Sequence, residues 1–253
     1  MRKIDRTGEI NYNNFGSKMI IINYRNNKDM NVYFPEYDYT KTNVNYGDFK
    51  KGNIICPYER RYHGKGYMGE GSYKVKINGK HTKHYDVWSD MLRRCYDFKY
   101  IQQHPSYVGC RVHDSWLNFQ IFSDWFQSNY YQIEGEQICL DKDILSKGNK
   151  IYSPDTCIFV PQTINKLFTK SNEIRGRFPV GVYYKKENKK YIAQCNVNKK
   201  QKHLGCYDTP EEAFQVYKNF KEKHIEEVAE EYKNKIPTKL YNAMITYEVE
   251  IDD

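Results

Sequence analysis

The stretch GVYYKKENKKYIAQCNVNKKQKHLGCYDTPEEAFQVYKNF, residues 181–220, decides the fold of the C-terminal part of this chain. Its alternation of apolar and polar residues predicts three short strands, and the residues after Asp208 predict a helix. Between Lys185 and Lys202 there are seven lysines against one glutamate, Glu187. Like charge of this density does not stabilise a structural sheet. A sheet laid against phosphates does gain from it, because each neutralised phosphate releases a counterion. The segment therefore predicts a nucleic-acid-binding sheet backed by a helix.

The helix of this segment carries its own start signal. Thr209 is the predicted N-cap, Pro210 the first helical residue, and Glu212 completes a capping box. The positions expected to face the core are Ala213, Tyr217, Phe220, Val228 and Tyr232. The other side is expected to be a solvated acidic face, with a protein partner as the alternative, and consists of Glu222, Glu226, Glu227, Glu230 and Glu231.

Residues 181–220 resemble the Apetala-two/ethylene-response-factor DNA-binding domain, which occurs in plant transcription factors and as an accessory module of phage and mobile-element endonucleases. The resemblance implies double-stranded DNA as the partner, with the sheet in the major groove and the helix behind it. The residues expected to contact DNA are Tyr183, Lys185, Lys190, Gln194, Asn196, Gln201 and His203. Plant members carry arginine or tryptophan at most of these places, so their sequence preference is not carried over.

Composition changes along the 253 residues predict an α+β protein of three modules. We expect a β-rich, barrel-like module at residues 1–75, a domain of helices followed by a degenerate ββα unit at 76–170 and the sheet-plus-helix domain at 171–253. The net charge of +8 and the pI near 8.9 suit a polyanionic partner.

The seven cysteines stand singly, without a CxxC pair, and no secretory signal opens the sequence. These features predict reduced thiols and a cytoplasmic protein. The longest apolar run, Met19 to Ile22, is four residues, so no membrane partner is expected.

The N-terminal module is expected to be strand-rich. Residues 18–24 and 30–34 predict strands joined by a turn at 26–29. The text GEINYNNFGSKMIIINYRNNKDMNVYF resembles a module of phage-type accessory and endonuclease proteins. Further on, the glycines of HGKGYMGEGSYKV, residues 63–75, predict a flexible joint rather than a phosphate-binding loop. Helices are expected at 84–98 and 114–128, with all three tryptophans in the core.

The segment LDKDILSKGNKIYSPDTCIFVPQTINKLF, residues 140–168, resembles the ββα-metal core of HNH endonucleases. The upstream text WSDMLRRCYD and HPSYVGCRVHDSWLNFQIFSDW resembles phage proteins related to that group. The resemblance implies that Asp141 and Asn165 hold one divalent ion, Mg²⁺. In that chemistry the metal stabilises charge on the phosphate while a histidine deprotonates water.

This sequence departs from the HNH pattern at the general base. Lys142 stands where the histidine belongs, and lysine with its usual pKa of about 10.4 cannot accept a proton near neutrality. His113 or His104 could replace the base, and Asp143 could replace a lost ligand. The alternative is that Asp141 and Asp143 only cap the strand and anchor the following loop.

Three functional hypotheses follow. The first is a DNA-binding protein of phage or mobile-element type, related to HNH homing endonucleases, whose nuclease centre is weakened or lost. The second keeps an active, Mg²⁺-dependent nicking or homing endonuclease. The third is a phage effector that blocks a host nucleoprotein or defence complex, in the manner of an anti-CRISPR protein, inside the bacterial cytoplasm.

Overall fold

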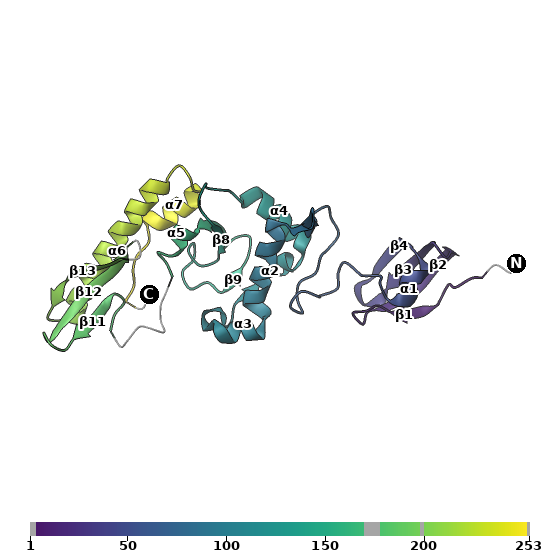
Figure 1. Cartoon of the computed structure of the whole chain (residues 1–253), viewed down its shortest axis with the longest axis horizontal. Coiled ribbons are helices and arrows are strands. Elements are labelled where there is room, and N and C mark those ends of the chain that lie inside the picture. Colours follow the sequence, from purple (N-terminus) through teal and green to yellow (C-terminus); the bar gives the residue numbers. More distant parts are fainter. Residues whose placement is uncertain (1–3, 170–177, 198–199, 252–253) are drawn as a thin grey trace. The chain divides into compact units, whose positions relative to one another are not determined.

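The computed structural model describes residues 4–169, 178–197 and 200–251, and its contacts divide the chain into two compact units (Figure 1). The first unit takes its residues from Met1–Asn129 and Lys150–Asp155, and the second from Tyr130–Asn149 and Thr156–Asp253. Helices and several small, mostly antiparallel sheets occur together, which confirms the α+β class. Among the described residues, no helix has the length and apolarity needed to span a membrane.

The first unit begins with a four-stranded antiparallel meander in the order β1-β2-β3-β4. Its elements are β1 (Ile10–Tyr12), β2 (Lys18–Asn26), β3 (Asp29–Phe34), the 3-10 turn η1 (Pro35–Tyr37), β4 (Tyr39–Val44) and α1 (Tyr46–Lys51). Alternate residues of β2 and β3 are fully buried, and Phe49 of α1 packs against them. The two strands and the turn at Asn27-Lys28 confirm the sequence prediction. The strand order is that of an open meander, so closure into a barrel is not confirmed.

The rest of the first unit is mainly helical. Its elements are β5 (Lys76–Ile77), β6 (Lys80–His81), α2 (Lys83–Tyr96), α3 (Phe98–Gln103), η2 (Pro105–Tyr107), β7 (Arg111–Val112), η3 (Asp114–Leu117), α4 (Phe119–Asn129) and β9 (Ile151–Tyr152), which pairs in parallel with β7. Trp88 and Trp116 are fully buried, and the Trp88 Nε1–H donates to the Trp116 carbonyl at 2.8 Å. They are core residues as predicted, whereas Trp125 is only half-buried.

The helix predicted from residue 114 is interrupted. The chain forms η3, leaves helical geometry at Asn118 and resumes as α4, because the backbone around Asn118 bridges to Tyr67. The Tyr67 N–H donates to the Leu117 carbonyl, and the Phe119 N–H donates to the Tyr67 carbonyl. A long-range backbone contact therefore overrides the local helical pattern.

Of the glycines expected to form a flexible joint, Gly66, Gly69 and Gly71 are closely packed, whereas a Cβ on Gly64 would meet nothing within 4 Å. A Cβ on Gly66 would lie 2.4 Å from Leu92, and one on Gly71 would lie 2.3 Å from Gln120. Gly69 also has a φ of +68°, a region that favours glycine. These residues permit close approach of the chain to α2 and α4.

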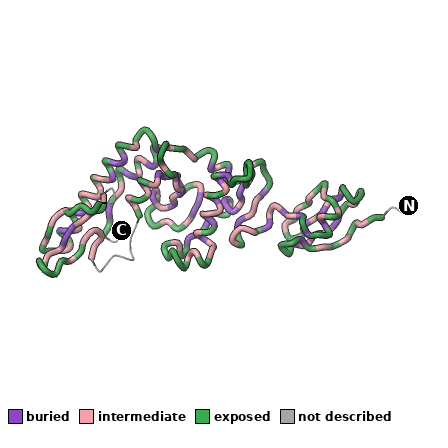
Figure 2. Tube along the Cα trace, viewed as in Figure 1, coloured by how far each residue is buried: buried purple, intermediate pink, exposed green. Residues whose placement is uncertain are grey.

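The described part of the second unit combines two small antiparallel sheets with three helices. Its elements are β8 (Ile138–Asp141), β10 (Ile158–Pro161), α5 (Gln162–Asn165), β11 (Val182–Lys185), β12 (Lys190–Val197), β13 (Lys200–Tyr207), α6 (Pro210–Tyr232) and α7 (Thr238–Ile245). The α6 N-terminus has the predicted capping box between Thr209 and Glu212. Along α6 the tube of Figure 2 alternates between buried and exposed residues, as expected for a helix with one apolar side.

One hydrophobic core joins the β8–β10 hairpin to the C-terminal half of α6. Ile158 and Val160 of β10 belong to the same buried cluster as Ile225 and Val228 of α6, and Leu240 of α7 completes it. The domain boundary expected at residue 170 lies outside the described residues. The segments on either side of it share this core.

Candidate nucleic-acid interface

The strand register places the predicted DNA-contacting residues on one face of the C-terminal sheet. Tyr183 pairs with Ile192, Lys185 with Lys190, Gln194 with His203 and Asn196 with Gln201. Directly paired residues share a face, and so do alternate residues of one strand. We call this set the outer face, and it comprises Tyr183, Lys185, Lys190, Ile192, Gln194, Asn196, Gln201 and His203.

The opposite face of the sheet is covered by α6. Ala193 is 0% exposed, and Cys195 belongs to a buried cluster with Tyr217 of α6. A Cβ on Gly181 would lie 2.1 Å from the Tyr217 ring, so strand and helix are in close contact there. Lys202 also lies on this side, with its Nζ 4.6 Å from the centroid of the Phe220 ring. The contacts of α6 therefore lie on the face opposite to the outer face.

A β-bulge keeps the third strand in register with that arrangement. The pairing shifts between Ala193 and Gln194, where Gly205 and then His203 are the partners. The extra residue, Leu204, packs against the buried cluster beneath α6. Because of the bulge, Leu204 packs on the α6 side of the sheet while its neighbour His203 lies on the outer face.

The outer face is polar at its edges and apolar in the middle. Lys185, Asn196, Gln201 and His203 are exposed, and Tyr183 is 41% exposed. Ile192, which the sequence analysis did not assign to a site, is only 2% exposed on this face between Tyr183 and Cys206. Alternation alone could have found it, since it lies between Lys190 and Gln194.

The lysines of the sheet differ in how free they are to bind an anion. Lys190 Nζ lies 2.5 Å from an Asp208 carboxylate oxygen, and both side chains are well exposed. Such surface pairs contribute about 0–1 kcal/mol, so a phosphate could replace Asp208. Lys185 and Lys186 are exposed in and beside the β11–β12 turn. Lys199 lies outside the described residues.

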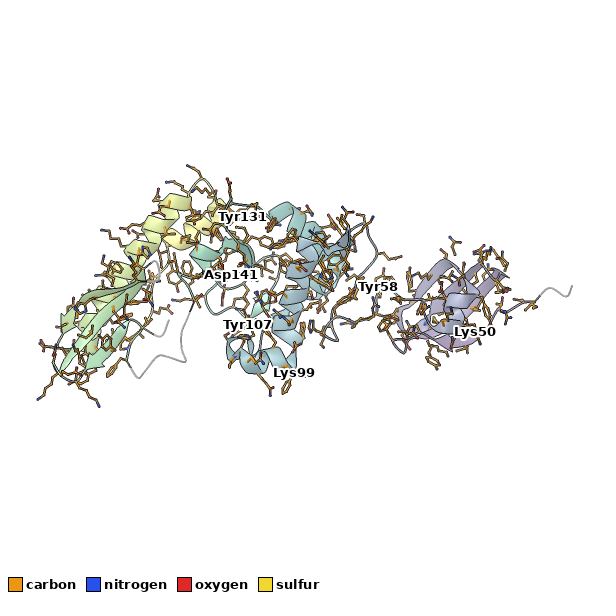
Figure 3. All side chains as sticks on the ribbon, in the orientation of Figure 1. Lys50, Tyr58, Lys99, Tyr107, Tyr131 and Asp141 are labelled. Atoms are coloured by element: carbon orange, nitrogen blue, oxygen red, sulfur yellow. The ribbon has the colours of Figure 1, made fainter. Side chains whose placement is uncertain are left out.

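The second candidate site is the end of β8, labelled at Asp141 in Figure 3. The Oδ1 of Asp141 accepts the backbone N–H groups of Asp143 at 2.9 Å and Ile144 at 2.8 Å. Burial, together with the nearby Asp143 charge, raises the pKa of Asp141 to about 6. Lys142 is 7% exposed, and its Nζ donates to Asp143 Oδ2 at 2.8 Å. The Asn149 amide donates to the Lys142 carbonyl at 2.6 Å.

These contacts favour the loop-anchoring alternative. The Asp141 carboxylate already accepts hydrogen bonds from two backbone N–H groups, and the Lys142 ammonium neutralises the charge of Asp143. Mg²⁺ is typically bound by carboxylate oxygens. The Lys142 ammonium is already paired with the Asp143 carboxylate, and its positive charge would repel a metal ion there. Within residues 4–169, 178–197 and 200–251, no group of three or more histidine, cysteine or acidic side chains could hold a metal ion. The donors present at Asp141 therefore fit a divalent ion poorly.

The other residues predicted for this site lie on other elements than β8. Asn165 is the last residue of α5, a helix of four residues that contacts β8, and its carbonyl accepts the Phe168 N–H at 3.2 Å. His113 belongs to the first unit, where it caps η3 and its Nδ1 lies 2.8 Å from the Ser115 hydroxyl. His104, the other candidate base, also belongs to the first unit.

The C-terminal segment is a structural part of the second unit that the sequence analysis missed. Val249 is 3% exposed and packs with Cys195 and Tyr217. Its N–H donates to Glu222 at 2.8 Å, and its carbonyl accepts from Lys218 at 3.0 Å. Glu222 is therefore not part of a solvated acidic face. The alternation of apolar and acidic residues after Thr246 was the available signal.

Comparisons of the chain with protein-family models, with curated proteins and with solved structures found no match. The assignment of a function consequently depends on the residues and on their geometry.

Proposed function

We propose that this protein binds double-stranded DNA through the outer face of its C-terminal sheet, as a protein of phage or mobile-element type with a weakened or lost nuclease centre. The observation that carries the proposal is the strand register. It brings the residues expected to contact DNA onto the one face of the sheet that α6 does not cover.

The side chains of this face suit a DNA-binding surface with modest sequence preference. Lys185 and Lys190 lie opposite one another at one end of the sheet, where they can neutralise phosphates. Gln194 and Asn196 follow along β12, and amide side chains can pair with adenine through two hydrogen bonds. The face carries no arginine, so the strongest form of guanine recognition is missing.

The test is a salt titration of duplex binding by the full chain. We expect Lys185→Ala to weaken binding to every sequence alike and to reduce the log–log salt slope by about 0.9, the loss of one phosphate contact. The matched control is Lys223→Ala, which removes an exposed lysine from α6. Asn196→Ala should instead change the preference between sequences. Equal losses from Lys185→Ala and Lys223→Ala, or no duplex binding at low salt, would overturn the proposal.

A further inference from the structure

The first unit carries a cluster of rings and cations at the end of α2, in α3 and in η2 that the proposed DNA interface does not use. Between Arg93 and Arg111 the sequence has four arginines or lysines and one aspartate, Asp97. We call this surface the ring patch, and define it by Arg93, Lys99, Tyr100, His104, Tyr107 and Arg111. Lys99 and Tyr107 are labelled in Figure 3.

The rings of the patch form one cluster, in which the Tyr100 ring is tilted by 42° to the His104 ring and by 39° to the Tyr107 ring. The Arg93 guanidinium carbon lies 4.5 Å from the Tyr100 ring centroid, and the Tyr100 and His104 rings are 4.3 Å apart. Tyr107 lies 5.9 Å from Tyr100 and accepts the Arg94 guanidinium over its own ring at 5.7 Å. Tyr100 and Tyr107 are half-buried, but His104 is exposed. His104, which also lies 6.5 Å from the Tyr107 ring, is therefore the exposed aromatic residue of this ring cluster.

Short-range contacts hold Tyr100, Arg93 and Arg94 of this ring cluster in place. Asp97 caps α3 through its carboxylate, which accepts the Tyr100 N–H at 2.9 Å, and Asp90 forms ion pairs with both Arg93 and Arg94. The single Asp90 carboxylate pairs with two guanidinium groups, so these three side chains together keep a net positive charge. The rings are ordered before any ligand arrives, which lowers the entropic cost of stacking on them.

The residues next to this ring cluster in the sequence are cationic and exposed. Lys99 and Arg111 are exposed on either side of it in the sequence. Phe98, at the first position of α3, is 72% exposed. Packing in the core does not account for a phenyl ring that lies in solvent. Cations beside exposed rings are the combination that binds single-stranded nucleic acid, because a single strand offers both phosphates and unstacked bases.

We propose that the ring patch binds unpaired nucleotides of a single-stranded nucleic acid, with a base stacked on His104 and phosphates near Lys99 and Arg111. Duplex DNA does not satisfy this site equally well, because its bases are already stacked inside the helix. This site is separate from the outer face of the C-terminal sheet and does not depend on duplex binding there.

The experiment measures binding of the full chain to a fluorescent 20-nucleotide oligothymidylate and to an abasic strand of the same length. Base–aromatic stacking is worth about 1–3 kcal/mol per base, so wild type should prefer the oligothymidylate by about 5- to 150-fold. His104→Ala should abolish that preference, and His104→Phe should retain it. Lys99→Ala should weaken binding to both strands alike, whereas Lys83→Ala, which removes an exposed lysine from the start of α2, should change neither.

An oligouridylate arm distinguishes RNA from DNA as the natural source of the strand. Lys185→Ala is the cross-control, since it should weaken duplex binding and leave the oligothymidylate preference unchanged. Equal affinity of wild type for the abasic and oligothymidylate strands would overturn the proposal. So would loss of single-strand binding in Lys185→Ala but not in His104→Ala, because that would place both ligands on the sheet.

Discussion

Replacing Asp141 by asparagine is expected to stabilise the second unit at pH 7. The Asp141 Oδ1 accepts two backbone N–H groups, and an asparagine Oδ1 can accept the same two. Burial, with the Asp143 charge as a further cause, raises the pKa of Asp141 from 3.8 to about 6. The ionised carboxylate is thus disfavoured in the folded protein, and the neutral amide removes that cost.

The size of the effect follows from the difference between the folded and the ordinary pKa. At about 1.36 kcal/mol per pH unit, this difference corresponds to about 3 kcal/mol of unfolding free energy, as an upper limit. Between pH 3.8 and 6 the folded state binds more protons than the unfolded state at this residue. The stability contributed by protonated Asp141 is therefore complete below pH 3.8 and is lost as the pH rises through 6. Asp141→Asn should lack this pH dependence.

Urea unfolding can assign the effect to the right unit, because Trp88, Trp116 and Trp125 all belong to the first unit. Far-UV circular dichroism should show a higher midpoint for Asp141→Asn at pH 7, while the tryptophan fluorescence transition should stay unchanged. Asp208→Asn is the matched control, since it removes a carboxylate that is 78% exposed in its side chain.

Two outcomes would refute this reasoning. A less stable Asp141→Asn at pH 7 would show that the folded protein needs the charge on this carboxylate. A midpoint that Mg²⁺ raises in wild type but not in Asp141→Asn would show that the carboxylate binds the metal, since a ligand stabilises the state that binds it. The second outcome would restore the HNH-type metal site.

Two further predictions concern the core and the chemistry of the second unit. Ile225→Ala should lower the unfolding free energy by about 2–5 kcal/mol, because Ile225 is fully buried between α6 and the β8–β10 hairpin, whereas the exposed neighbour change Glu226→Ala should have little effect in the same circular dichroism measurement. A small loss from Ile225→Ala would contradict a shared core. Supercoiled-plasmid assays with Mg²⁺ or Mn²⁺ should show no nicking by wild type or by Lys142→His, although a general base added to an intact centre would raise the rate by about 10²–10⁴-fold. Wild-type nicking that Asp141→Ala abolishes would favour the active-endonuclease hypothesis.

The sequence predicted those parts of the fold that depend on local pattern. Alternation identified the strands around Ile21 and Val32 and divided the residues of β11–β13 between two faces, because side chains of a strand alternate whatever the tertiary context. The family resemblance then indicated which of the two faces is the outer one. The capping box at Thr209 located the start of α6 for the same reason, since cap and partner lie three residues apart.

The parts that were missed depend on contacts between distant segments. The break at Asn118 requires Tyr67, and the packed glycines require α2 and α4. The metal centre expected from the sequence likewise gave no sign that the Asp141 carboxylate accepts two backbone N–H groups, or that Lys142 is buried against Asp143. Hydrogen-bond partners are set by the fold, so a motif alone leaves the role of its residues open.

The helix α6 connects the two halves of the second unit and determines how the DNA-binding face is supported. Its first turns, with Ala213 and Tyr217, pack behind the three-stranded sheet, while Ile225 and Val228 pack on the β8–β10 hairpin. The segment at Val249 fixes the same helix through Lys218 and Glu222. A fragment that starts near residue 171 would remove the hairpin and expose the second half of α6. The β8–β10 hairpin, where the sequence led us to expect a metal-binding core, therefore packs on the same helix that backs the sheet proposed to bind DNA, and burial of this half of α6 gives a physical reason for the hairpin even without catalysis.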